Sequence, residues 1–133
     1  MNHLANKNAK FFPQVNQLPK NPLIFVTMSA TQAYSVGVLT RYIKQRLEGD
    51  PVLQDVWVVG EVSNLTQHGS GHVYFTLKDE EAQLSCAMFK GVAMHYLRKM
   101  PKHGAKIQVR GELSLYPPQG SYQLIVREMQ IAG

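Results

Sequence analysis

Aromatic and basic side chains adjoin each other in segments where apolar and polar residues alternate. Phe89 is followed directly by Lys90 at the end of one such segment. Alternation places Phe89 opposite the apolar Leu84 and Met88, so a large ring faces solvent beside an ammonium group. Rings that stack on bases and cations that contact phosphates are how proteins hold single-stranded nucleic acids. We therefore predict a binding role for Phe89 and Lys90. The alternative is that Phe89 packs beneath a helix that begins near Val92.

Six more aromatic or basic side chains on expected strands are candidates for the same binding role: His72, Tyr74, Lys78, Arg110, Tyr116 and Tyr122. Tyr74 shares its outward face with His72 and Lys78, and we predict that it stacks on a base. The alternative is that Tyr74 packs against a helix that precedes the strands. Lys78 ends its strand, and the acidic residues 79–81 that follow weaken its field.

The other three candidates also have structural alternatives. Arg110 either contacts a phosphate group or forms an ion pair with Glu112 or Glu128. Tyr116 and Tyr122 bracket an expected hairpin loop. They either clamp a bound strand or pack across the hairpin.

Chemistry other than binding finds little support in the residues. His68 and His72 bracket a glycine-rich turn, but no Cys or carboxylate beside them completes a metal site. The acidic residues 79–81 occupy an expected hairpin turn, where carboxylates are ordinarily solvated. Cys86 falls on the core-facing side of its strand, as a buried and unreactive thiol. We expect no catalytic residue, metal or cofactor in this domain.

The net charge of the chain is compatible with a nucleic-acid partner but is too small to predict one. The 133 residues carry a formal net charge of +5. Residues 1–33 hold three of the 14 basic side chains and no acid, so the rest carries eleven basic against nine acidic side chains. A binding site on the folded part must therefore depend on where a few charges are placed.

The cysteine count and the apolar runs indicate the compartment. A single cysteine excludes an internal disulfide and agrees with a reducing cytoplasm. The longest apolar run, from Pro22 to Met28, is far too short to cross a bilayer. The amino terminus lacks the apolar core and cleavage site of a signal peptide. We expect a cytoplasmic protein that does not contact membranes.

The elements that must position these residues are short strands. Residues 1–33 are expected to be a flexible extension, with 23–26 as a possible strand, and 34–133 the folded domain. The patterns predict helices over 38–48, capped by Ser35, and over 92–100, and strands over 56–65, 72–78, 83–90, 106–116 and 122–129.

Gly60 indicates a bulge or sharp bend in the first strand, and Trp57 is expected in the core. Five strands with a helix between the third and fourth predict a mainly β, antiparallel OB-fold barrel. Its binding groove is expected between the loops 64–71 and 116–120.

Three longer runs of residues are distinctive: "YSVGVLTRYIKQRLE" (34–48), "WVVGEVSNLTQHGSGHVYFTLKDEEAQLSCAMFKG" (57–91) and "VRGELSLYPPQGSYQLIVREMQIAG" (109–133). Together they resemble the amino-terminal domain of the exodeoxyribonuclease VII large subunit, over about residues 34–133. Three positions depart from that family: Val73 stands where an aromatic residue is usual, and Lys90 and Gln119 stand where arginine is common. Each departure lowers the expected grip on DNA.

The resemblance implies an OB domain that holds single-stranded DNA for a nuclease. It places DNA contacts at Phe89 and Lys90, where the family's motif has an aromatic and a basic residue. The whole enzyme degrades single-stranded DNA from either end to oligonucleotides with 5′-phosphates, and it binds several copies of a small subunit. It also implies that this chain is an isolated, non-catalytic domain, and it leaves the metal requirement of the catalytic region open.

Two other functions fit the same residues. An OB domain with these rings also suits RNA, as in domains that hold tRNA anticodon loops. A protein-interaction module is the third possibility, with the groove or residues 23–26 docking on a partner. Salt dependence separates nucleic acid from protein partners, because phosphate contacts weaken as salt rises.

Overall fold

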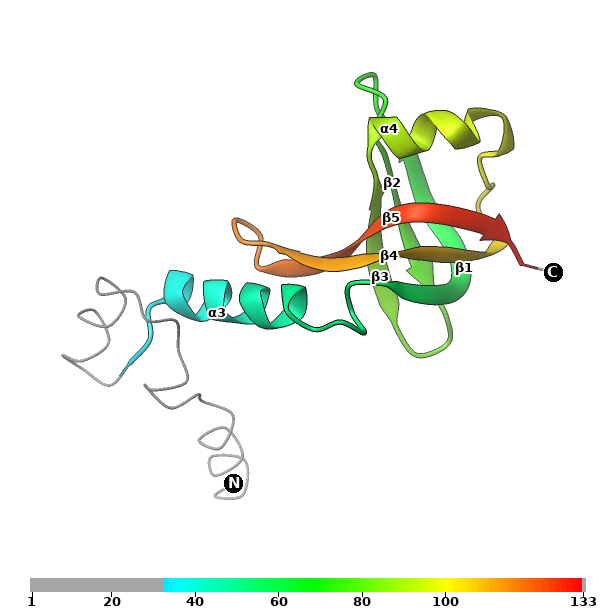
Figure 1. Cartoon of the computed structure of the whole chain (residues 1–133). Helices are drawn as coiled ribbons and strands as arrows, with labels where there is room; N and C mark the ends of the chain where they lie inside the picture. Colours follow the sequence, from blue (N-terminus) through cyan, green and yellow to red (C-terminus); the bar gives the residue numbers. More distant parts are fainter. Residues whose placement is uncertain (1–32, 133) are drawn as a thin grey trace. The chain divides into compact units, whose positions relative to one another are not determined.

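The strands follow one another in the chain with one helical interruption, as the alternation of apolar residues predicts. The computed structural model describes residues 33–132, so the predicted extension 1–33 lies outside the described residues except for Ala33. The elements are α3 (Val36–Glu48), β1 (Val56–Gln67), β2 (Val73–Lys78), β3 (Gln83–Met88), α4 (Lys90–Ala93), the 3₁₀ helix η2 (Met94–Lys99), β4 (Lys106–Tyr116) and β5 (Ser121–Ile131) (Figure 1).

The chain divides into two compact units, residues 1–42 and 43–133, with the boundary inside α3. In the first unit the Ser35 hydroxyl accepts a hydrogen bond from the Val38 amide at 3.1 Å. This satisfies an amide that the first turn of a helix leaves without a partner. Ser35 is thus the cap that the sequence predicts. Val38 is buried and packs against Tyr34 and Tyr42.

In the second unit the end of α3 is held by a glutamine. The Gly49 amide donates to the Gln45 carbonyl at 2.9 Å, where the predicted stop begins. The Gln54 amide nitrogen donates to the Leu47 carbonyl at 2.9 Å and to the Leu113 carbonyl at 3.0 Å. Both hydrogens of this amide are used, so Gln54 has a structural role.

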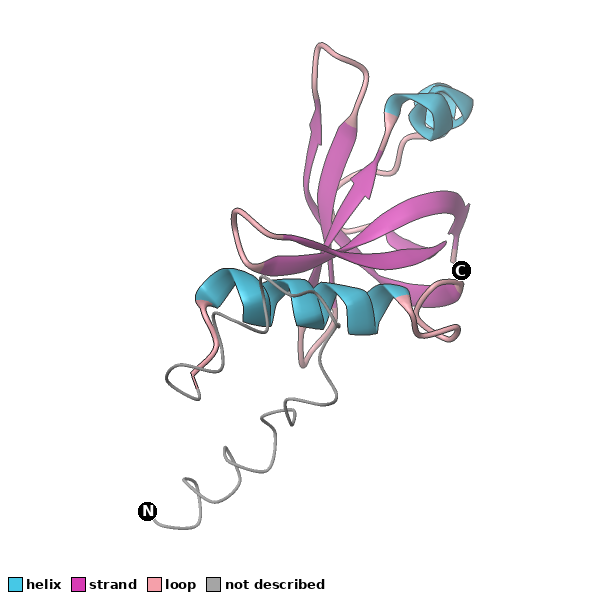
Figure 2. Cartoon of the chain, turned by 60° about the vertical axis from the view of Figure 1, so that its left-hand side comes forward, coloured by secondary structure: helices cyan, strands magenta, loops and turns pink. Residues whose placement is uncertain are grey.

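The five strands close into a barrel, and the strands curve around a common interior in Figure 2. Their order in the barrel is β1-β2-β3-β5-β4. This is the predicted OB-fold order, with α4 and η2 between the third and fourth strands. Four of the pairings are antiparallel, but β3 and β5 run parallel through Cys86–Leu124 and Ala87–Ile125. The predicted OB-fold barrel is confirmed, and the parallel seam at which β3 and β5 close it is a detail that the prediction of antiparallel strands did not include.

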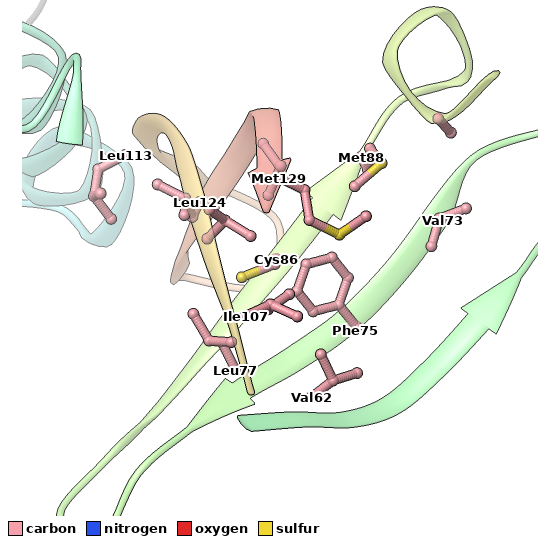
Figure 3. Packing of buried hydrophobic residues seen from close by; sticks show 13 residues of the cluster. Val62, Val73, Phe75, Leu77, Cys86, Met88, Ile107, Leu113, Leu124 and Met129 are labelled. Atoms are coloured by element: carbon pink, nitrogen blue, oxygen red, sulfur yellow. The ribbon is translucent and has the colours of Figure 1, made fainter. Parts of the chain in front are cut away.

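Alternation along the strands produces the core. Val73, Phe75 and Leu77 of β2 are buried, as predicted, and the polar residues between them are not. Side chains from all five strands converge in the barrel interior (Figure 3). Burial of this apolar surface stabilises the fold by roughly 25 cal/mol for each Å² removed from water.

The curvature of β1 comes from two places. At Gly60 an added Cβ would lie 2.8 Å from Leu77 Cγ, so close approach of β2 requires glycine. The strand changes partner at Glu61, which pairs with both β4 and β2. The bulge expected near Gly60 lies further along, between Ser63 and Thr66, where the register with β2 shifts. A tight barrel needs both devices to bend one long strand.

The segment predicted as one helix over 92–100 is α4 followed by the tighter η2. A 3₁₀ helix has three residues per turn, so Ala93 and Tyr96 share the face that packs on the core while Leu97 turns outward. The Tyr96 hydroxyl accepts a hydrogen bond from the Met129 amide at 3.1 Å. Both helices therefore close one end of the barrel (Figure 1).

Candidate nucleic-acid interface

A groove of about 550 Å³ lies over β2 and β3 and extends to the β4–β5 loop. Its lining consists of Asn64, Tyr74, Phe75, Thr76, Ser85, Cys86, Phe89, Tyr116, Gln119 and Gln123. Tyr74, Phe89 and Tyr116 expose 36%, 43% and 49% of their surface. The structure thus brings together three of the predicted binding residues, from β2, the start of α4 and the end of β4. The groove also lies between the two loops that the sequence indicates.

The groove is uncharged, so the basic candidates Lys78, Lys90 and Arg110 are not among the residues that line it. None of its lining residues is Lys, Arg, Asp or Glu. Its polar character comes from hydroxyl and carboxamide groups. Stacking and hydrogen bonding, rather than charge, are therefore what the lining itself offers a ligand.

Phe89 and Lys90 are held by the β1–β2 loop. The Lys90 amide donates to Nδ1 of His72 at 2.9 Å, and the rings of His72 and Phe89 meet edge to face at 5.4 Å. Gly71 has a φ of +96°, and a Cβ added there would lie 2.9 Å from Lys90 Cγ. The aliphatic part of Lys90 therefore lies over a position that only glycine fits. His72 contacts Phe89 and Lys90 and is absent from the groove lining.

The same loop contacts a second ring of the groove. The rings of His68 and Tyr74 meet edge to face, with centroids 4.9 Å apart and planes at 79°. Tyr74 lines the groove and is 36% exposed, so its ring is accessible to a ligand. Two loop histidines therefore each support one ring of the groove.

Lys78 and Tyr122 lie elsewhere. Lys78 lines a separate depression, where three acidic residues, Glu61, Asp79 and Glu80, accompany Lys78 and Lys106. Tyr122 lines a depression with Leu53, Val58 and other residues, and it does not share the groove with Tyr116. The two tyrosines that bracket the β4–β5 loop therefore do not face one site. Tyr122 pairs with Leu115, the residue before Tyr116, and successive side chains of a strand point to opposite faces.

Arg110 is engaged in ion pairs. Its Nε lies 2.6 Å from Asp55 Oδ1 and its Nη2 lies 2.8 Å from Oδ2, while Glu128 Oε2 lies 3.4 Å from Nη1. Arg127 also approaches Asp55, at 3.4 Å. The hydrogen bonds from Arg110 hold the pKa of Asp55 below its usual value, and the same bonds raise the pKa of Arg110. The ion-pair alternative holds for Arg110, with Asp55 as a partner that sequence reasoning missed.

Trp57 lies on this second face. It pairs across β1 and β4 with Arg110, and it is 44% exposed. The prediction that Trp57 lies in the core is wrong. Val56 and Val58 pack against the core, and successive side chains of a strand point to opposite faces, so Trp57 between them points outward.

The remaining reactive groups have structural roles. Burial raises the pKa of the Cys86 thiol to about 12, so this thiol stays protonated at neutral pH. Asp79 Oδ1 accepts hydrogen bonds from the Glu81 and Ala82 amides, and these bonds lower its pKa. Within residues 33–132, no three His, Cys, Asp or Glu side chains lie together as a metal site would require. No helix in that range has both the length and the apolar character needed to span a membrane.

Sequence reasoning missed Asn64 and Gln123 as residues of the groove, and it treated Gln119 only as a departure from the arginine that is common in the family. Asn64 and Gln119 lie in the loops that were expected to border the groove. Their position in those loops was the available signal, but only aromatic and basic side chains were named as candidates for binding.

Known proteins resemble this chain over most of its length. The family described as "OB-fold nucleic acid binding domain" matches residues 34–130. The chain is 50% identical over 99 residues to the exodeoxyribonuclease 7 large subunit of Geobacillus kaustophilus, covering 74% of this chain and 22% of that protein. It is 49% identical over 106 residues to the protein of the same name from Brevibacillus brevis, covering 80% and 23%. The chain thus spans about a fifth of the length of these relatives. The resemblance found in the sequence is confirmed.

Solved structures resemble the fold. Asparaginyl-tRNA synthetase from Pyrococcus horikoshii superposes with a TM-score of 0.52 at 15% identity, over 68% of this chain and 21% of that one. A replication protein A heterotrimer bound to ssDNA superposes with a TM-score of 0.50 at 15% identity, over 61% and 59%. At this identity the likeness concerns the fold alone.

Proposed function

This chain belongs to the family of OB-fold nucleic acid binding domains, and from this premise we propose that it binds single-stranded DNA in the groove over β2 and β3. The observation that carries the proposal is the convergence of Tyr74, Phe89 and Tyr116 on one uncharged groove. Every base offers a π-face, and stacking on a side-chain ring contributes about 1–3 kcal/mol per base. Bases in a duplex are stacked on each other and do not reach these rings.

The domain serves, in this proposal, as the DNA-holding part of an exodeoxyribonuclease VII large subunit. The name and the identity of the relatives support this assignment. The full-length protein would degrade single-stranded DNA from both ends to oligonucleotides with 5′-phosphates, together with copies of a small subunit in the cytoplasm. The domain by itself would bind DNA without cleaving it.

Fluorescence anisotropy tests the binding directly. We expect labelled single-stranded DNA to bind, the same sequence as a duplex to bind more weakly, and Phe89→Ala to weaken the single-strand complex. The proposal would be overturned if duplex and single-stranded DNA bound with equal affinity. It would also be overturned if substitution of Phe89 and Tyr116 left the affinity for single-stranded DNA unchanged. Single-stranded RNA of the same sequence serves as the competitor. If the domain binds the RNA more tightly than the DNA, the ligand is RNA and the proposal of single-stranded DNA is overturned.

A further inference from the structure

Three carboxamide side chains line the groove, those of Asn64, Gln119 and Gln123. Within residues 33–132 none of these side chains makes a hydrogen bond. The Gln54 carboxamide, by contrast, donates two. A carboxamide carries two donor hydrogens and an acceptor oxygen. The groove therefore offers hydrogen-bonding groups of both kinds beside its rings, and the described chain does not use them.

Asn64 reaches the groove through an unusual backbone conformation. Its φ is +54°, the one positive φ among the described residues other than glycine. Val62 is fully buried, so regular alternation would direct Asn64 into the core as well. The bulge between Ser63 and Thr66 interrupts this alternation, and Asn64 is exposed at the groove instead.

Barrel curvature alone does not explain an asparagine at this position. Glycine adopts a positive φ at lower cost, because it has no Cβ. Gly71, Gly104 and Gly120 occupy the positive-φ positions elsewhere in the described chain. What Asn64 adds over glycine is its carboxamide, and backbone conformations of higher energy cluster at functional sites.

We propose that Asn64, together with Gln119 and Gln123, contacts base edges in the bound strand and makes the groove prefer adenine. The inference rests on the proposed function and deepens it. A carboxamide pairs with N6 and N7 of adenine through two hydrogen bonds. Arg and Lys favour guanine, and Asp and Glu favour cytosine, but none of these lines the groove. A groove that binds by stacking alone would show little discrimination.

The test uses single strands with repeating TTA, TTC or TT-7-deazaadenine sequence, and oligothymidine as the reference. The base 7-deazaadenine stacks like adenine but lacks the N7 acceptor. We expect the wild-type chain to bind the TTA strand about fivefold or more tightly than the other two repeats. A factor of about five is the lower limit of the discrimination that one bidentate contact to a base edge provides. Equal affinity for the three repeats would overturn the inference.

The variant Asn64→Gly tests whether the adenine preference depends on the Asn64 side chain. Glycine retains the positive φ and removes the carboxamide, so the variant should fold with undiminished stability and lose the adenine preference. Gln108→Ala is the matched control, because Gln108 is exposed on β4 and does not line the groove. An unchanged preference in folded Asn64→Gly would overturn the inference.

Phe89→Ala separates this inference from the proposed function. Binding that depends on Phe89 but shows no base preference overturns the inference and leaves the proposed function standing. Absence of any binding that depends on Phe89 overturns both.

Discussion

Two faces of the barrel expose aromatic rings of similar accessibility in different surroundings. Phe89 is 43% exposed at the groove, and Trp57 is 44% exposed on the face of β1 and β4. The groove lining around Phe89 is uncharged, and its carboxamides make no hydrogen bonds within the described chain. On the second face, Arg110 lies opposite Trp57 and is bound to Asp55.

The difference shows why an exposed ring beside a basic residue does not by itself define a binding site. A phosphate that approached Arg110 would have to displace the carboxylate of Asp55. At the groove, a base can stack and form hydrogen bonds without breaking contacts of the folded chain. The cation nearest in sequence to the groove ring Phe89 is Lys90, whose stem lies over Gly71. We therefore assign ligand binding to the groove and fold support to the second face.

The largest expected effect on affinity comes from removing the ring at the groove, and removal of the ring on the second face provides the comparison. Phe89→Ala should weaken single-stranded DNA binding by about 1–3 kcal/mol, because one stacked base loses its platform. Trp57→Ala should leave the affinity unchanged, although it removes a larger ring of equal exposure. Anisotropy titrations of both variants, with thermal melts to verify folding, provide the measurement. A loss of affinity in Trp57→Ala would reverse the assignment of the two faces.

His72 supports Phe89 and Lys90 through two contacts that substitution can separate. His72→Phe retains a ring beside Phe89 and removes the acceptor for the Lys90 amide, while His72→Asn retains an acceptor and removes the ring. A hydrogen bond of this kind contributes on the order of 1 kcal/mol, so His72→Phe should weaken binding by about fivefold or less. We expect His72→Asn to restore part of that loss. If both variants bind like the wild type, the loop does not position these residues.

The salt dependence of binding distinguishes the cations of the two faces. Lys90→Ala should flatten the dependence of log affinity on log salt by about 0.7, the contribution of one phosphate contact in a single strand. Arg110→Gln should leave the slope unchanged, because its guanidinium is engaged with Asp55. Titrations at several potassium chloride concentrations measure both slopes. A flatter slope in Arg110→Gln alone would place the phosphates on the second face.

The smallest expected effect is the acid dependence of stability on the second face. Arg110 holds the pKa of Asp55 below its ordinary value of 3.8, so the ionised carboxylate favours the folded state. This contribution is complete above about pH 5 and is lost as the pH falls through the lowered pKa of the folded state. Asp55→Asn should therefore be less stable than the wild type at neutral pH, and this difference in stability should shrink as the pH falls below 3.8. Urea midpoints across this range test the prediction, and a constant difference at every pH would contradict it.

Local periodicity determined most of the fold. Alternation placed Val73, Phe75 and Leu77 in the core, and Ser35 and Gly49 set the ends of α3. These features depend on neighbours within a few residues, which is why the sequence by itself predicts them. The order of strands and helices then predicted the OB fold, and the resemblance to known sequences indicated the ligand class.

Only the tertiary structure decided which outward side chains share a site. Tyr74, Phe89 and Tyr116 meet because β3 pairs with β5 at the barrel seam, while Tyr122 lies at another depression. Asn64 reaches the groove through a bulge whose position depends on register with β2. Arg110 finds Asp55 across 55 residues of chain. Pairing register and barrel closure are non-local, so residue spacing determined which way each side chain points and not what it meets there.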